Sequence, residues 1–159
     1  MTALILGIDP GKKGALALVD EGGRLLDVHD MPDATGAALG AQVRVLLADH
    51  APHTVAVAWV EQVASRPGQG VASMFKFGAG WGAILGALGA LGVPVELRTP
   101  QQWKKAMRVT ADKASSRQRA TELWPSDAGW FTRVKDDGRA EAALLAEYGR
   151  RCGIGGGDR

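Results

Sequence analysis

Four acidic residues stand where the sequence predicts the ends of two strands and the start of a helix. Asp9 closes the first apolar run of the chain, and Glu61 closes a later run rich in valine and alanine. Asp137 and Glu141 are separated by one helical turn, so they share one face of a predicted helix. If the two strands are parallel neighbours, Asp9 and Glu61 lie at the same edge of a sheet, which is where α/β proteins place their ligand sites.

A cluster built from carboxylates alone favours Mg²⁺ or Mn²⁺ over zinc, because these hard cations prefer oxygen ligands. Two such ions about 3.5–4 Å apart activate a water and stabilise the leaving oxygen in phosphodiester hydrolysis. Glu141 precedes the apolar run 142–146, so it lies near the edge of the predicted core and needs a partner. A cation bound also by Asp9 and Glu61 supplies that partner. Each acid also has an ordinary explanation, as a turn residue before Pro-Gly or as a solvated strand end, and these stay open.

Basic residues concentrate in the second half of the chain, although the formal net charge is only +2. Between the predicted sheet and the acidic helix, side chains of the types that contact phosphates gather in one short segment. This distribution fits a polyanionic partner such as DNA, and a solvated face of an amphipathic helix is the alternative. The candidate DNA-binding residues are Lys104, Lys105, Lys113, Ser115 and Arg117.

The elements that must position these residues follow from hydrophobic periodicity and turn signals. The first three predicted strands are separated by tight turns and form an antiparallel meander, whereas the later strands alternate with helices and are expected to run parallel. The pattern predicts one α/β domain over 1–152 with a five-stranded mixed sheet, followed by a flexible tail over 153–159. Strands are predicted over 4–8, 15–19, 24–29, 54–60 and 93–97, helices over 37–48, 72–91, 101–107, 112–123 and 137–151, and irregular chain over 126–132.

The segment 77–95 carries no charged residue and approaches the length of a membrane span. Its many glycines and alanines favour instead a buried helix that packs closely on the sheet. The apolar residues of the helix 72–91 cannot all face one sheet. Either a second copy of the chain or the helices from residue 101 onward must therefore cover the remaining surface.

Composition narrows the class of protein further. With 46% hydrophobic and 23% charged residues, the chain is expected to be a soluble globular protein. Cys152 is the single cysteine of the sequence, which excludes a disulfide framework and a cysteine-based zinc site. No basic region precedes the first apolar run, so no signal peptide is expected, and the cytoplasm is the predicted compartment.

Three motifs together resemble the RuvC-type Holliday junction resolvases of the RNase H-like superfamily. The segment 7–11, Gly-Ile-Asp-Pro-Gly, and the segment 14–17 that follows are similar to the opening of that family. The segment 60–63, Val-Glu-Gln-Val, looks like its second motif. The segment 137–142, Asp-Gly-Arg-Ala-Glu-Ala, is similar to the final motif in the form found in bacteriophage relatives.

The resemblance covers most of the chain and implies a five-stranded RNase H-like sheet flanked by helices. It implies a homodimer, joined through the helix equivalent to 72–91, that introduces paired nicks into four-way DNA junctions with Mg²⁺ or Mn²⁺, two ions per active site. It also implies the cytoplasm of a bacterium or of a phage-infected host as the location. By motif, the implied catalytic residues and metal ligands are Asp9, Glu61, Asp137 and Glu141.

Two departures from the family pattern bear on junction selectivity. Bacterial RuvC enzymes carry an aromatic residue just past the second motif that wedges into the junction, and here that position is Ala64. The last acid is glutamate where bacterial forms usually have aspartate, and the neighbouring acid is displaced by one residue, so Asp136 is a rival to Asp137. The aromatic residues considered in place of the wedge are Phe75 and Trp81.

Two other functions are compatible with parts of the pattern. An Asp-x-Gly strand–turn–strand also opens the sugar kinases and actins, but those proteins need two such domains to enclose ATP, and this chain is long enough for one. A non-catalytic protein that binds junctions with the same fold is the second alternative, and the retained acids argue against it. Metal-dependent nicking of a synthetic four-way junction separates all three functions.

Overall fold

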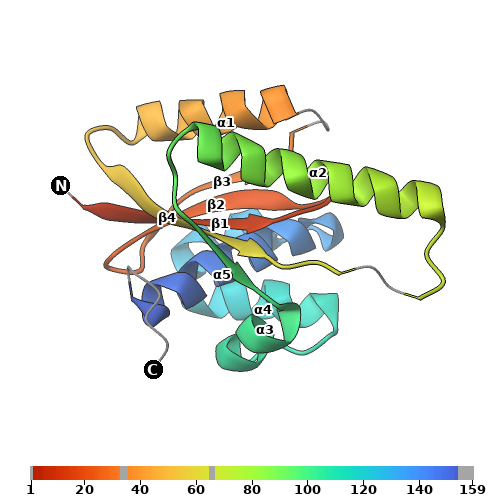
Figure 1. Cartoon of the computed structure of the whole chain (residues 1–159). Helices are drawn as coiled ribbons and strands as arrows, with labels where there is room; N and C mark the ends of the chain where they lie inside the picture. Colours follow the sequence, from red (N-terminus) through yellow and green to blue (C-terminus); the bar gives the residue numbers. More distant parts are fainter. Residues whose placement is uncertain (1, 33–35, 65–66, 154–159) are drawn as a thin grey trace.

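A five-stranded mixed sheet forms the middle layer of the protein (Figure 1). The computed structural model describes residues 2–32, 36–64 and 67–153, and the predicted tail after Gly153 lies outside them. The strand order is β3-β2-β1-β4-β5, with the first three strands antiparallel and β1, β4 and β5 parallel. The strands are β1 (Ala3–Asp9), β2 (Ala15–Asp20), β3 (Leu25–Asp30), β4 (Thr54–Glu61) and β5 (Val95–Arg98).

The helices cover the two faces of this sheet unequally (Figure 1). Two helices lie on one face, α1 (Gly36–Asp49) and α2 (Val71–Ala90). Three lie on the other, α3 (Pro100–Met107), α4 (Lys113–Leu123) and α5 (Asp137–Cys152). The sheet and the helices confirm the predicted fold class. The segment predicted as irregular, 126–132, lies mostly in a short 3₁₀ helix, η1 (Pro125–Phe131), and a second one, η2 (Val134–Asp136), follows it before α5.

Helix α5 packs directly on β1 because both surfaces are built from small residues. A Cβ at Gly7 would collide with the Ala142 carbonyl oxygen, so the helix backbone lies against the strand backbone. Ala142 and Ala146 are fully buried at this contact. A Cβ at Gly138, in the first turn of α5, would likewise collide with the carbonyl oxygen of Lys13 in the turn after β1. These contacts place the first two turns of α5 beside the end of β1.

Helix α2 is far less buried than its sequence predicts. Its buried residues are Ile84 and Leu88, which join the core between the sheet and α1. The later helices lie on the opposite face of the sheet, so the alternative in which they cover the surplus apolar face of α2 is wrong. By length and composition alone, α2 would be long and apolar enough to cross a membrane. Within one copy of the chain, this helix therefore has an apolar surface that no other element among residues 2–32, 36–64 and 67–153 covers.

Candidate active site

The acids predicted at the strand ends lie at one edge of the sheet. Asp9 is the last residue of β1 and Glu61 the last residue of β4. The two strands are parallel neighbours, and the residues just before the acids, Ile8 and Val60, are register partners. The expectation that β1 and β4 present both carboxylates at the same edge is confirmed.

Asp9 is surrounded by negative charge. Burial and the nearby carboxylates of Glu141 and Glu61 raise the pKa of Asp9 well above its usual value, and Lys104 and Lys113 oppose this shift. Within the described residues, no hydrogen bond or ion pair holds the Asp9 carboxylate. Asp9, Glu61 and Glu141 therefore form one electrostatically coupled cluster, which we call the acidic edge.

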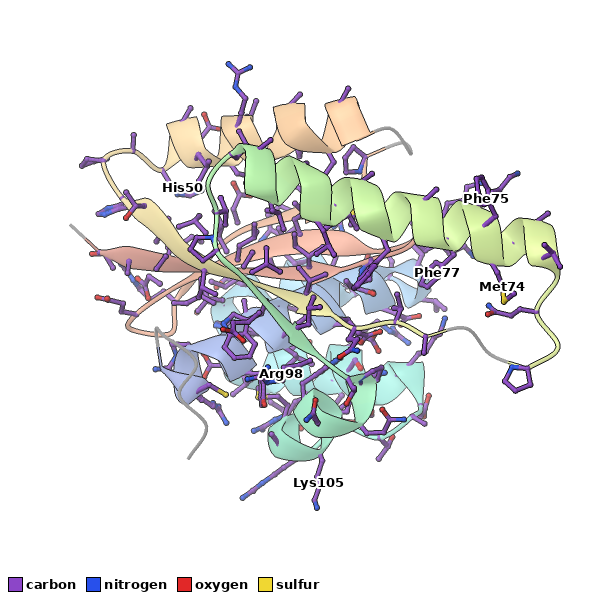
Figure 2. The ribbon with its side chains drawn as sticks, viewed as in Figure 1. His50, Met74, Phe75, Phe77, Arg98 and Lys105 are labelled. Carbon is purple, nitrogen blue, oxygen red and sulfur yellow. The ribbon has the colours of Figure 1, made fainter. Side chains whose placement is uncertain are left out.

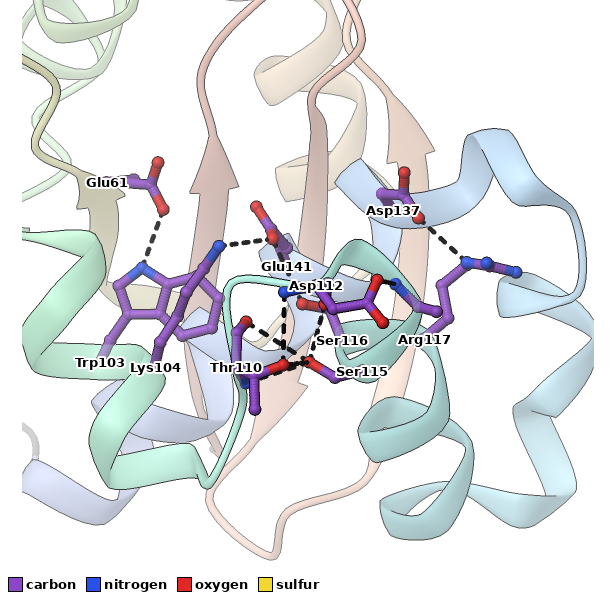
Figure 3. A network of polar contacts seen from close by, with 11 residues as sticks. Glu61, Trp103, Lys104, Thr110, Asp112, Ser115, Ser116, Arg117, Asp137 and Glu141 are labelled. Atoms are coloured by element: carbon purple, nitrogen blue, oxygen red, sulfur yellow. Dashed lines mark hydrogen bonds and ion pairs between the residues drawn. The ribbon is translucent and has the colours of Figure 1, made fainter.

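Partners from α3 and α4 hold the two glutamates of the acidic edge (Figure 3). The indole Nε1 of the fully buried Trp103 donates to Glu61 Oε2 at 2.9 Å. Lys104 Nζ donates to Glu141 Oε1 at 2.8 Å, and Ser116 Oγ donates to the same oxygen at 3.2 Å. Both glutamates are thus held by side chains of the protein.

The start of α3 explains why two consecutive residues reach the acidic edge. Thr99 caps the helix: its side chain accepts from the Gln102 backbone N–H, and the Gln102 side chain accepts from the Thr99 backbone N–H. Pro100 occupies the first turn, where its missing N–H costs nothing. The helix therefore begins at once after β5 and directs Trp103 toward the end of β4 and Lys104 toward the start of α5.

The rival acids at the start of α5 occupy different environments. Asp136 is 1% exposed, and it accepts from the backbone N–H of Arg133 at 2.8 Å and from Arg133 Nε at 2.9 Å. Asp137 accepts from Arg117 Nε at 3.0 Å and keeps part of its side chain exposed. Asp136 is buried and held by Arg133, three residues before it, whereas Asp137 lies on the same helix face as Glu141. The charges that act most strongly on Asp9 include neither of them.

As the side chains stand, no group of three or more His, Cys, Asp or Glu residues among 2–32, 36–64 and 67–153 is arranged to hold a metal ion. The chemistry of the acidic edge nevertheless fits a hard divalent cation. Its donors are carboxylate oxygens only, and their mutual repulsion at Asp9 is relieved by positive charge. The ammonium of Lys104 supplies one such charge to Glu141.

The predicted DNA-binding residues divide into two groups. Lys105 and Lys113 are exposed, and Lys105 points away from the body of the protein (Figure 2). The other three are engaged within the chain: Lys104 with Glu141, Arg117 with Asp137, and Ser115 with the Thr110 backbone N–H in the loop before α4.

The two aromatic residues considered for the junction wedge also differ. Trp81 is partly buried, and its Nε1 donates to the backbone carbonyl of Glu61 at 3.3 Å, which ties α2 to the end of β4. Phe75 is 76% exposed near the start of α2, where Figure 2 shows it on the part of the helix that extends past the sheet. Phe75 therefore has a free aromatic face, whereas Trp81 supports the acidic edge.

Sequence reasoning missed the side chains that hold the acids. It did not foresee that the Nε1 of the buried Trp103 holds the Glu61 carboxylate. It assigned Lys104 to DNA contacts, whereas the ammonium lies on Glu141. The available signal was the Thr-Pro cap directly after β5, which fixes the direction of α3, but the strand end that Trp103 reaches is 42 residues before it in the chain.

No family model matches the chain, and a search of curated proteins finds no match. Solved structures do match. RuvC of T. thermophilus in complex with a Holliday junction substrate has a TM-score of 0.63 and 22% identity, over 96% of this chain and 97% of that one. A second T. thermophilus RuvC structure has a TM-score of 0.61 and 23% identity, over 95% and 97%. The yeast mitochondrial Holliday junction resolvase Ydc2 has a TM-score of 0.59 and 17% identity, over 92% and 77%. The chain therefore has the RNase H-like fold of the RuvC-type resolvases over nearly its whole length.

Proposed function

We propose that this protein is a metal-dependent DNA endonuclease that resolves four-way junctions by paired nicks. The observation that carries the proposal is the acidic edge, where burial, Glu141 and Glu61 raise the pKa of Asp9 at the end of the central strand. The fold adds support, since one of the similar structures is a RuvC in complex with a Holliday junction substrate.

The metal ligands that we propose are Asp9, Glu61, Asp137 and Glu141, which would hold two Mg²⁺ or Mn²⁺ ions. Such ions supply an activated water and stabilisation of the leaving oxygen. Trp103 and Ser116 orient Glu61 and Glu141 through their hydrogen bonds.

The basic residues of α3 and α4 are proposed to bind the phosphate backbone. Lys105 on α3 and Lys113 on α4 are exposed, and Lys113 is close enough to the acidic edge to lower the pKa of Asp9. Lys104 and Arg117 can reach phosphates only by leaving Glu141 and Asp137, and Ser115 only by leaving its turn. Phosphate contacts position DNA without reading its sequence, which suits a protein that recognises a branched shape.

The uncovered surface of α2 supports a homodimer. The glycines at 78, 82, 86 and 89 follow one another at helical spacing, and a Cβ on any of them would meet no atom of another described element within 4 Å. A four-way junction has approximate two-fold symmetry, so two acidic edges related by a two-fold axis can cut opposed strands. We propose that two copies of α2 pack through this glycine stripe.

We also propose a cytoplasmic location, in a bacterium or a phage-infected cell, because that is where this function would be carried out.

A non-catalytic junction-binding protein is the second candidate. It is favoured by one observation, the ion pair between Lys104 and Glu141, which supplies this acid with a counter-ion from the protein itself. Under this alternative the acids are structural, and junction binding does not depend on divalent ions.

Incubation of the protein with an end-labelled synthetic four-way junction tests the proposal. We expect symmetric nicks with Mg²⁺ or Mn²⁺, and binding without cleavage with Ca²⁺, whose longer and looser coordination misplaces the attacking water. Asp9→Asn should lose at least about a hundredfold in nicking rate, because one metal-bridging charge is removed. The matched control is Asp49→Asn, an exposed acid at the end of α1 on the other face of the sheet. Nicking by Asp9→Asn at the control rate would refute the assignment, and junction binding without any nicking would favour the second candidate.

A further inference from the structure

We infer that Lys104 is the internal cation of the acidic edge and that its positive charge lowers the affinity of this site for divalent metal. The inference rests on the proposed function in one respect, that the acidic edge binds Mg²⁺ or Mn²⁺. Lys104 Nζ lies 2.8 Å from Glu141 Oε1, and the two side chains are 22% and 13% exposed. An ion pair so largely withdrawn from water is screened far less than a surface pair.

The position of this ammonium is defined by the helix that carries it. The capping box at Thr99 sets the direction of α3, and the hydrogen bond from Trp103 to Glu61 anchors the residue just before Lys104. The ammonium also lies 5.3 Å from the centre of the Trp103 ring, within the range of a cation–π contact. Lys105, the next residue, points away from the protein (Figure 2). The two adjacent lysines thus differ in whether they face the acids.

The Lys104 charge and the divalent ion act on the same carboxylates. Of the two lysines that act on Asp9, Lys104 acts more strongly than Lys113. Coulomb repulsion scales with the product of the charges, so a divalent ion near this ammonium is repelled twice as strongly as a monovalent one. In the metal-free protein the same ammonium stabilises the fold, because Glu141 would otherwise be a largely buried carboxylate without a counter-ion.

Loss of Lys104 also removes a group that orients Glu141, and this works in the opposite direction. Ser116 Oγ donates to the same oxygen, Glu141 Oε1, and would continue to hold the side chain. In the described part of the chain, neither hydrogen bond nor ion pair engages the other oxygen, Oε2, so Lys104 does not block it. The loss of positive charge therefore outweighs the loss of orientation, and neutralising Lys104 should increase the affinity of the site for metal.

Mn²⁺ titration without DNA, followed by calorimetry and by melting temperature, tests this inference. We expect Lys104→Gln to bind Mn²⁺ about tenfold more tightly than the wild type, to melt at a lower temperature without metal, and to gain more from Mn²⁺. Lys104→Met is a second neutral variant, which replaces Lys104→Gln in the test if Lys104→Gln folds poorly. Lys104→Arg keeps the charge and Lys105→Gln neutralises the outward lysine, so both should bind Mn²⁺ as the wild type does.

Asp9→Asn separates the two ways in which the test can fail. If Mn²⁺ binds the wild type through Asp9 but binds the neutral Lys104 variants equally or more weakly, the role of Lys104 is refuted and the metal site stands. If Mn²⁺ binding that depends on Asp9 is found in neither the wild type nor the neutral variants, the metal-dependent function is refuted, and this inference with it. Binding that appears only in the neutral variants supports the inference.

Discussion

The indole Nε1 of Trp103 donates a 2.9 Å hydrogen bond to the Glu61 carboxylate, although the two residues are 42 positions apart in the chain. This bond joins α3 to the end of β4 at the acidic edge. Trp103→Phe should keep most of the packing and lose the donor. We expect a loss of about 1–2 kcal/mol in the free energy of unfolding, because a hydrogen bond to a charged acceptor is stronger than a neutral one. Urea denaturation measures this loss. Trp130→Phe, at an exposed tryptophan on η1, is the control, and equal stability of the two variants would contradict the prediction.

The raised pKa of Asp9 makes a prediction about stability as well as cleavage. An aspartate whose pKa is higher in the folded than in the unfolded state favours folding when protonated. Its ionisation costs stability as pH rises through the folded-state pKa. Asp9→Asn cannot ionise, so without metal it should melt at a higher temperature than the wild type at neutral pH. The difference should shrink as pH falls toward the unfolded-state pKa. A melting series from acid to neutral pH in a chelating buffer checks this, and a difference that does not vary with pH would count against it.

The exposed lysines of α3 and α4 predict a salt effect on DNA binding. Lys105→Ala and Lys113→Ala should each weaken binding for all DNA sequences alike. Each should also reduce the slope of log affinity against log salt by roughly one. Lys104 and Arg117 already pair with acids, so their replacement by alanine should change the slope less. Arg44→Ala on α1 is the control, and an unchanged slope for both lysine variants would mean that they form only a solvated face.

The glycine stripe of α2 predicts a variant that separates folding from dimerisation. A Cβ at Gly82 would have open space around it, with no atom of another described element within 4 Å, so Gly82→Leu should fold normally. At a close helix–helix contact the same side chain would force the two copies apart. Sedimentation equilibrium at micromolar concentration should show a dimer for the wild type and for Gly129→Leu, and a single 16.7 kDa chain for Gly82→Leu. A wild type at 16.7 kDa with paired nicking intact would exclude the dimer.

Phe75 predicts a role in opening the junction that is separate from hydrolysis. Its ring is exposed near the start of α2, where it can stack on an unpaired base. Phe75→Ala should lower the nicking rate on a fully paired junction about tenfold or more, since stacking on one base is worth about 1–3 kcal/mol. It should have little effect on a junction with unpaired bases at the crossover. Comparing nicking rates on the two substrates checks this, and an equal loss on both would assign Phe75 another role.

Local patterns were enough to predict the sheet, because each strand is an apolar run that ends at a turn. Each predicted strand boundary lies within two residues of the observed one. The burial of α2 was mispredicted for a physical reason: apolarity shows that a surface needs cover, but not whether the cover belongs to the same chain. The partners of the acids escaped prediction because they join residues far apart in sequence. Lys104 and Glu141, for example, are 37 positions apart and meet only after α3 and α5 have docked on the sheet.

The close contact between Gly7 and Ala142 means that a residue without a polar side chain, Gly7, determines the spacing of the acids at the acidic edge. Glu141 is the residue just before Ala142, so its distance from Asp9 is set by how closely α5 lies on β1. A single methyl group at position 7 would lift the helix and move Glu141 away from Asp9. Variation at this glycine can therefore separate the acids of the acidic edge, although every acid, lysine and tryptophan around it stays the same.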